Sequence, residues 1–341
     1  MTWSTVASSV PLHCSFPMQR IDSSESANLL NDPSNPYFTM SSFALIKTLL
    51  LVAVAFQSTA YTIVRRLSRG VNEESYSNAS VLLIIEILKF FFSLLIVTFE
   101  RDFSLMHIVT TSLPLLLPAM GYLVMNVLSF IAIKHVDATT FIVIIQLKLL
   151  TTALFSICIM GKSISARRWR SLITLTIGVT LIALPSGEPT NTGGSSVSRD
   201  ENYIFGVLAV LIEVVLSGFT SVFFESTLKS SEMSVWGRNV QLSMWSILIY
   251  ASTVSAETQT DMFRGWTPLA VACALLGALG GILVALALRF TDSLSKTIAT
   301  SSCIILTCLF NSFLLGEPVT LHVVLYVAVV VMAVVEYVHG A

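Results

Sequence analysis

Long apolar segments alternate with short polar ones along almost the whole chain. The apolar segments cover residues 43–64, 80–98, 113–133, 138–160, 168–185, 203–224, 239–256, 266–288, 293–315 and 317–338. A helix needs about 20 mainly apolar residues to cross the hydrocarbon core of a bilayer, and each segment is near that length. The pattern therefore predicts an all-α membrane protein with ten transmembrane helices.

The polar stretches between these segments predict how the chain is organised. Residues 1–42 are rich in Ser, Asn and Pro and are expected to form a flexible cytosolic tail. Residues 186–202 contain a Gly-Gly-Ser-Ser sequence and are expected to form a luminal linker between two sets of five spans, 43–185 and 203–338. Because five is odd, the second set must enter the membrane inverted. Two inverted five-helix repeats are a transporter architecture, with the substrate site between the halves near the bilayer midplane.

The basic residues of the loops predict which side of the membrane each loop faces. An excess of Lys and Arg marks cytosolic loops, and this rule places both termini in the cytosol. The strongest signal is one short loop with four basic residues and no acidic one: Lys162, Arg167, Arg168 and Arg170. A second cluster, after the first span, opposes this orientation: Arg65, Arg66 and Arg69.

The composition agrees with a membrane protein and removes other classes. Hydrophobic residues make up 54% of the chain and charged residues 11%, against about 25% charged in soluble domains. A net charge of −1 excludes a nucleic-acid binder that reads a basic face. The cysteines and histidines lack the spacing of metal or redox sites, and no catalytic serine motif or phosphate-binding loop occurs. We therefore predict no metal, no cofactor, no catalytic residue and no enzymatic activity.

Lys148 lies in the middle of the fourth apolar segment, about ten residues from either end. A charged group at that depth is costly in lipid, so it is expected to face a cavity. Helical spacing places an aromatic ring, aliphatic side chains and a hydroxyl on the same face: Phe141, Ile144, Ile145 and Thr152. Such a face suits a ligand that has a flat base and an anionic group.

Lys296 in the ninth segment has two interpretations. In the first, Lys296 pairs with Asp292, four residues earlier, and the two form a capping ion pair at the cytosolic surface. Alternatively it is a second phosphate-facing cation. Two lysines from opposite halves would nearly neutralise a diphosphate and would still release it, because ammonium groups are hydrated point charges.

Two further groups are predicted to be structural or to take part in gating. Glu86 and Lys89 lie three residues apart on one face of the second span and are expected to pair. The eighth span carries Gly277, Gly280 and Gly281, whose spacing lets helices approach closely or leaves a smooth wall beside a ligand. Glu213, in the sixth span, receives no role from the pattern.

Four stretches resemble the Golgi nucleotide-sugar transporters, in the branch that carries UDP-galactose, UDP-N-acetylglucosamine and CMP-sialic acid. They are the run 137–156, which ends in Gln146-Leu147-Lys148 and Leu149 to Ser156; Ser217-Gly218-Phe219 with Phe224-Glu225 and Leu228-Lys229; Val235-Trp236 with Arg238 to Leu242; and Gly280 to Ala285 with Thr291-Asp292-Ser293 and Lys296. The resemblance extends in order over about residues 43–338.

The resemblance implies a ten-helix fold of the drug/metabolite transporter type. It also implies that a cytosolic nucleotide sugar is exchanged for the nucleoside monophosphate left in the lumen after glycosyl transfer. Carried over position by position, Lys148 and Lys296 resemble the family's phosphate-facing lysines. The residues that resemble its nucleotide pocket are Tyr122, Asn126, Phe141 and Asn239.

The fourth span departs from the family, which reads Tyr-Gln-Val-Thr-Tyr-Gln-Leu-Lys where this chain has residues 141–148 as Phe-Ile-Val-Ile-Ile-Gln-Leu-Lys. Candidate hydrogen bonds to the sugar or ribose are thereby lost, so the sequence does not decide which nucleotide sugar is the substrate.

The favoured hypothesis is a Golgi antiporter that exchanges a UDP-sugar, UDP-galactose or UDP-N-acetylglucosamine, for UMP. The alternatives are a CMP-sialic acid/CMP antiporter and a non-transporting membrane scaffold for glycosyltransferases. The expected partners are the nucleotide sugar, the monophosphate and the lipid bilayer, with homo-oligomer formation or glycosyltransferase association left open and no nucleic acid.

Overall fold

The computed structural model describes residues 36–68, 72–100, 104–136, 138–183, 201–230, 232–257, 262–315 and 321–339. Residues 1–35 of the predicted tail (1–42) and residues 186–200 of the predicted linker (186–202) lie outside these ranges. Backbone contacts separate residues 1–46 from residues 47–341, and both predicted sets of spans lie in the second unit, apart from the first residues of the first span. The packing described below concerns the second unit by itself.

The described residues form helices and contain no strand, as the apolar pattern predicts. The helices are α2 (Pro36–Arg66), α3 (Asn78–Val97), α4 (Leu105–Thr110), α5 (Leu116–His135), α6 (Ala138–Ile145), α7 (Lys148–Met160), α8 (Ala166–Ala183), α9 (Glu201–Lys229), α10 (Val235–Glu257), α11 (Pro268–Phe290), α12 (Ser293–Leu315) and α13 (Leu321–His339). A short 3₁₀ turn, η2 (Leu113–Leu115), precedes α5.

Seven stretches of the described helices are long and apolar enough to cross a membrane: Ala44–Arg66, Asn78–Val97, Thr140–Met160, Tyr203–Lys229, Pro268–Phe290, Ser293–Phe310 and Leu321–His339. The protein is thus a helical membrane protein. Two of the remaining predicted spans are more polar at one end. Helix α8 begins with three arginines within its first five residues, and α10 carries Arg238, Asn239 and Gln241 in its first two turns.

Short polar residues and glycine set several helix ends. Ser77 accepts a hydrogen bond from the Ser80 N–H at the start of α3, and Thr267 does the same for α11, which has proline as its first residue. Helix α7 ends at Gly161, whose φ of 64° lies in the left-handed region that favours glycine. These ends allow the short connections that the sequence pattern requires.

The fourth apolar segment, predicted as one helix over 138–160, is broken in the structure. Helix α6 ends at Ile145 and α7 begins at Lys148, with a turn at Gln146 and Leu147 between them. The N–H of Leu149 bonds to the Gln146 carbonyl and that of Leu150 to the Leu147 carbonyl, so the helical ladder tightens locally to i→i−3. Broken spans are tolerated at membrane depth where protein surrounds them.

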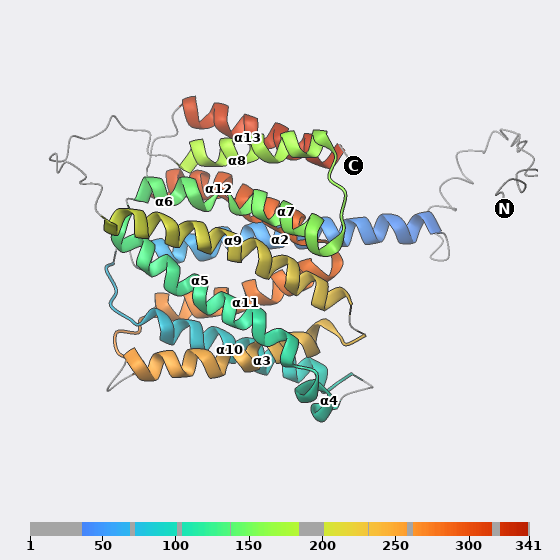
Figure 1. The fold of residues 1–341 in the computed structure, drawn as a ribbon, viewed down its shortest axis with the longest axis vertical. Helices are drawn as coiled ribbons and strands as arrows, with labels where there is room; N and C mark the ends of the chain where they lie inside the picture. Colours follow the sequence, from blue (N-terminus) through green and yellow to red (C-terminus); the bar gives the residue numbers. More distant parts are fainter. Residues whose placement is uncertain are drawn as a thin grey trace, which may run out of the picture. The chain divides into compact units, whose positions relative to one another are not determined.

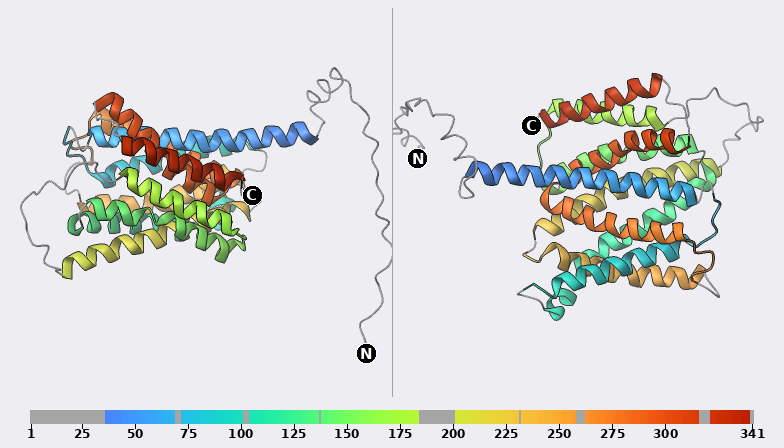
Figure 2. Two further views of the ribbon diagram at one scale, coloured as in Figure 1. Left: turned by 90° about the horizontal axis from the view of Figure 1, so that it is seen from above. Right: turned by 180° about the vertical axis from the view of Figure 1, so that it is seen from behind.

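The helices of the second unit pack side by side in Figures 1 and 2, and the closest neighbours come from distant parts of the chain. Helix α3 packs against α10 and α11, α5 against α9 and α10, α7 against α9 and α12, and α8 against α13. Buried apolar clusters hold these pairs together: one joins α7, α8, α12 and α13, and another joins α3 to α11. The core is therefore spread between helix pairs.

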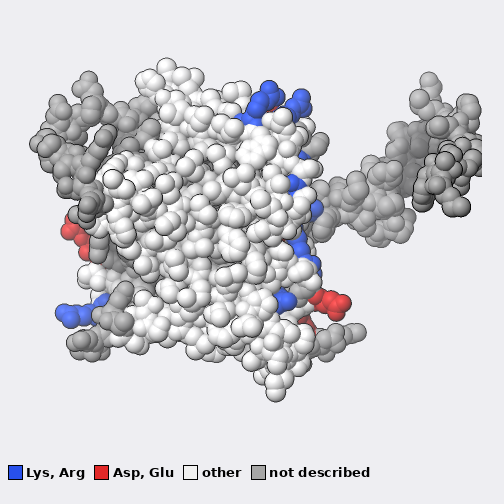
Figure 3. Space-filling view, viewed as in Figure 1, with Lys and Arg blue, Asp and Glu red and all other residues white. Residues whose placement is uncertain are grey.

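The outer surface is apolar between two charged ends. Large hydrophobic side chains are exposed on several helices, including Ile177, Leu248 and Leu275. Figure 3 shows that Lys, Arg, Asp and Glu on this face lie at the edges where helices end, with neutral residues between them. Exposed apolar side chains along the helices and charges at their ends are what a bilayer requires.

Candidate functional site

The two lysines predicted from the sequence come together between α7 and α12. Lys148 is the first residue of α7, directly after the break, and Lys296 lies in the first turn of α12. Both side chains are partly buried, and their positive charges are close enough to interact. Neither ammonium group forms an ion pair with a described residue. The structure thus places two positive charges beside each other inside the protein, and neither is held in an ion pair by a described residue.

The surroundings of Lys296 decide between its two interpretations. Asp292 caps α12, because its Oδ1 accepts a hydrogen bond of 2.7 Å from the Ser295 N–H. The ammonium of Lys296 instead lies 3.4 Å from the Ser221 hydroxyl of α9. The geometry therefore matches an inward-facing cation better than a capping ion pair with Asp292.

Lys148 has an acidic neighbour that the sequence pattern left without a role. Glu213 of α9 is 9% exposed and interacts electrostatically with Lys148. Its Oε1 accepts a hydrogen bond of 2.7 Å from the Ser129 hydroxyl of α5, while its Oε2 is buried without a hydrogen-bond partner among the described residues. The sequence did carry a signal: Glu213, Ser217, Ser221 and Glu225 are spaced by four and share one face of α9.

A close approach of α7 and α9 fixes the position of Lys148. The Thr151 hydroxyl donates to the Val214 carbonyl at 3.0 Å, one turn along α7 from Lys148. Gly218 makes this contact possible, since a Cβ there would lie 2.7 Å from the Thr151 hydroxyl oxygen and 2.8 Å from its carbonyl carbon. The Ser-Gly-Phe sequence of α9 therefore serves to bring α7 close.

Tyr122 and Asn126 lie on α5 in a second polar group. The Asn126 amide nitrogen donates to the Tyr250 hydroxyl of α10 at 2.8 Å. The charge of Glu86 on α3 interacts with both Tyr122 and Tyr250. The predicted pair of Glu86 with Lys89 is confirmed, at 2.8 Å and with both side chains largely buried.

The three glycines of α11 form the surface on which α2 and α3 pack. A Cβ at Gly277 would meet Ile85 of α3, one at Gly280 would meet Gln57 of α2, and one at Gly281 would lie 2.8 Å from the Lys89 side chain. Gln57 also donates to the Leu276 carbonyl at 2.7 Å. These contacts correspond to the close helix packing expected of that spacing.

A cavity of about 270 Å³ opens beside Asn126, between the end of α2 and the start of α3. Its walls carry two phenol rings, a guanidinium and two amides among apolar side chains. The lining residues are Tyr61, Arg65, Tyr76, Asn78, Val81, Leu82, Asn126 and Cys273. The cavity thus reaches from a predicted nucleotide-pocket residue toward one end of the bundle.

Asn239 and Phe141, also predicted from the family resemblance, lie elsewhere in this conformation. Asn239 is 1% exposed and donates to the Ser93 hydroxyl of α3 at 3.2 Å, so it joins α10 to α3. Phe141 packs against an apolar cluster of α5 and α9 that includes Ala132 and Val210. Neither side chain is part of the lysine group.

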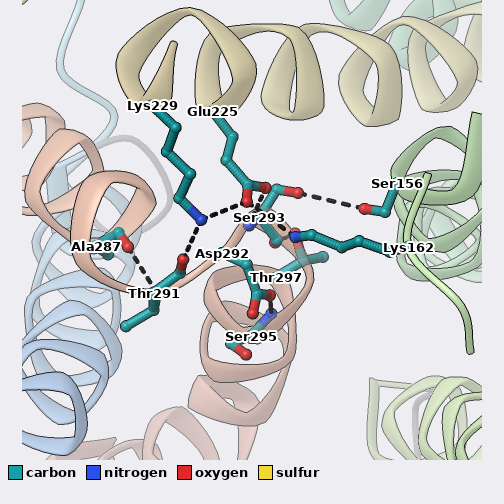
Figure 4. A network of polar contacts seen from close by, with 10 residues as sticks. All are labelled: Ser156, Lys162, Glu225, Lys229, Ala287, Thr291, Asp292, Ser293, Ser295 and Thr297. Atoms are coloured by element: carbon teal, nitrogen blue, oxygen red, sulfur yellow. Dashed lines mark hydrogen bonds and ion pairs between the residues drawn. The ribbon is translucent and has the colours of Figure 1, made fainter. Parts of the chain in front are cut away.

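A second network joins the end of α9, the connection between α7 and α8, and the start of α12 (Figure 4). Figure 1 shows these segments at the opposite end of the bundle from the start of α3. The carboxylate of Glu225 is fully buried and accepts hydrogen bonds from Lys162 at 2.9 Å, Lys229 at 2.7 Å and the Ser293 N–H at 2.7 Å. Lys229 also donates to the Thr291 carbonyl at 2.5 Å. Glu225 and Lys229 are four residues apart on α9, whereas Lys162 and Ser293 are distant in sequence and meet Glu225 only in the fold.

Comparison with known proteins gives a consistent result. The family model for the nucleotide-sugar transporters matches residues 42–338. The chain is 33% identical to a UDP-N-acetylglucosamine/UDP-N-acetylgalactosamine transporter of Caenorhabditis elegans, over 86% of this chain and 94% of the relative. It is 31% identical to the human UDP-N-acetylglucosamine transporter (85% and 94% covered) and 31% identical to the Bos taurus UDP-galactose translocator (80% and 72% covered).

One solved structure has the same fold at low sequence identity. It superposes with a TM-score of 0.67 at 13% identity and covers 86% of this chain and 98% of its own. The family and the relatives named above are transporters and not enzymes, as was predicted for this chain.

Proposed function

Because this chain belongs to the nucleotide-sugar transporter family, we propose that it moves a UDP-sugar across the Golgi membrane in exchange for UMP. UDP-N-acetylglucosamine and UDP-galactose are the favoured substrates, since these sugars appear in the names of its relatives. The exchange proceeds by alternating access, in which one site is opened to either side in turn.

The observation that carries this proposal is that Lys148 and Lys296 lie close together and that neither forms an ion pair with a described residue. Two positive charges inside a membrane protein are costly unless an anion offsets them. A UDP-sugar and UMP both bring phosphate oxygens, and Lys148 also stands at the N-terminus of α7, whose dipole favours negative charge. We assign the phosphates to the two lysines and the nucleoside, that is the base and ribose, to the group around Tyr122 and Asn126.

The ten-span architecture with two inverted repeats is part of the proposal. If the first five spans are exchanged with the second five, α2 maps onto α9, α3 onto α10, α5 onto α11, α7 onto α12 and α8 onto α13. Under this exchange, helix contacts in the structure correspond to other observed contacts. The contact of α3 with α11 corresponds to that of α5 with α10, and the contact of α7 with α8 corresponds to that of α12 with α13. The hydrogen bonds of Gln57 to α11 and of Thr59 to α12 likewise correspond to the packing of α9 against α5 and α7.

We assign the end that carries the Glu225 network to the cytosol. This end holds the basic loop between α7 and α8 with Lys162, Arg167, Arg168 and Arg170, and an excess of Lys and Arg marks cytosolic loops. The described residues of the other end include Arg65, Arg66 and Arg264. Both chain termini are then cytosolic. The network would be a closed cytosolic gate, and the cavity beside Asn126 would be the luminal opening of the site.

A nucleotide panel tests the proposed function. Purified protein is heated in the presence of UMP, CMP, GMP or AMP, because a ligand of the folded state raises the melting temperature by mass action. Stabilisation by UMP alone supports the UDP-sugar assignment. Stabilisation by CMP alone would replace it with CMP-sialic acid exchange, and no shift with any nucleotide would refute transport in favour of a scaffold.

A further inference from the structure

Among the described residues, Glu213 carries the one buried carboxylate oxygen without a hydrogen-bond partner, and the proposed exchange does not use it. Glu213 is held from one side by the Ser129 hydroxyl, and its second oxygen, Oε2, has no hydrogen-bond partner among the described residues. A buried carboxylate oxygen without a partner costs free energy, so native proteins rarely retain one without a reason. The position of this oxygen beside Lys148 indicates what the reason is.

Two observations place Glu213 next to the proposed phosphate site. Its charge interacts with that of Lys148, yet the two groups form no ion pair within 4 Å. The Val214 carbonyl, one residue along, accepts the Thr151 hydrogen bond from the first turn of α7. The carboxylate therefore stands to one side of the ammonium, and a ligand phosphate on Lys148 would have its next chemical group near Glu213.

The chemistry of that next group fits a carboxylate. The diphosphate of a UDP-sugar carries the ribose on one side and the hexose on the other. Because we assign the nucleoside to the group around Tyr122 and Asn126, the hexose is the group left for Glu213. Its hydroxyls, and in the N-acetyl sugars also the acetamide N–H, are hydrogen-bond donors. A carboxylate offers only acceptors and binds such donors through strong charge-assisted hydrogen bonds. On α6, by contrast, Phe141, Ile144 and Ile145 pack into an apolar cluster and supply no acceptor.

We propose that Glu213 is a specificity-determining residue, whose Oε2 accepts a hydrogen bond from a hydroxyl or amide N–H of the transported sugar. The inference rests on the proposed function and names a residue that selects among its substrates. Ser129 is then a positioning residue, which fixes the carboxylate so that Oε2 stays turned toward the ligand.

The test compares ligands with and without the sugar. The concentrations of UMP, UDP-N-acetylglucosamine, UDP-N-acetylgalactosamine and UDP-galactose that half-inhibit exchange of labelled UMP are measured in proteoliposomes. Glu213→Ala is expected to raise the concentration required for the preferred UDP-sugar about 10- to 100-fold, the effect of one hydrogen bond to a charged group. The concentration required for UMP stays within about threefold or falls, because removing a carboxylate from the phosphate site does not weaken phosphate binding.

Two further variants keep the result interpretable. Glu213→Gln retains the shape of the side chain and one acceptor oxygen, so the half-inhibiting concentration of the UDP-sugar should rise less than in Glu213→Ala. This variant replaces Glu213→Ala in the test if the alanine variant does not fold. Glu336→Gln, which removes an exposed glutamate charge, is the matched control and should change nothing. Equal weakening of UMP and the UDP-sugars, or no change in either, would overturn the inference. Wild-type protein that binds neither class of ligand would instead refute the proposed function.

Discussion

The Glu225 network should contribute a large and localised part of the protein's stability. Three hydrogen bonds end on a carboxylate that has no exposed surface. The bond from the Ser293 N–H is buried and charge-assisted, which corresponds to about 1.5–3 kcal/mol. The lysine side chains are 31% and 32% exposed, so solvent screening reduces each pair to about 0.5–1 kcal/mol. Glu225→Ala is therefore expected to lower the free energy of unfolding by about 2.5–5 kcal/mol.

Thermal unfolding of the purified protein, followed by tryptophan fluorescence, measures this effect. The midpoint should fall on the order of 5 °C or more for Glu225→Ala, and by far less for Lys162→Met, which removes one screened pair. Glu336→Ala is the matched control, because its pair with Arg170 is 3.7 Å long and its side chain is 43% exposed. Equal midpoints for Glu225→Ala and Glu336→Ala would refute the view that the buried carboxylate holds these helices together.

Three further perturbations test the site and its frame. Lys148→Ala should abolish nucleotide exchange and stabilisation by UMP without preventing insertion; normal uptake by this variant would remove the phosphate assignment. Gly218→Val should destabilise the protein by about 1–3 kcal/mol or more, because the new side chain meets the backbone of Thr151, and an unchanged melting temperature would contradict the close approach. Asn126→Ala and Tyr250→Phe should each cost about 0.5–1.5 kcal/mol, and the double variant should cost less than their sum in a thermal unfolding cycle.

Much of the fold follows from the apolar pattern. Seven of the ten predicted segments contain helices apolar enough to span a membrane, and the predicted segment boundaries lie close to helix ends. The pattern predicts spans well because lipid offers no hydrogen bonds, so each crossing must be a long apolar helix. It did not predict the break before Lys148, since Gln146 and Leu147 are both ordinary helix formers.

The candidate site was only partly predictable, for a physical reason. A lysine in mid-membrane is so costly that its position alone marks it, which is why Lys148 stands out in the sequence. Glu213 is also buried, but its hydrogen bond to Ser129 and its proximity to Lys148 depend on how α5, α7 and α9 pack. The bond between Lys162 and Glu225 likewise joins residues 63 positions apart.

The break divides the fourth span into two short helices. Helix α7 carries Lys148 and is locked to α9 through Gly218, whereas α6 carries the side chains at positions 141–145 and is joined to α7 only by a two-residue turn. Substitutions on α6 can therefore change the shape and polarity of that helix without moving the ammonium group of Lys148. If Lys148 binds the phosphates as proposed, residues 141–145 can change in related transporters while the position of the proposed phosphate site is kept.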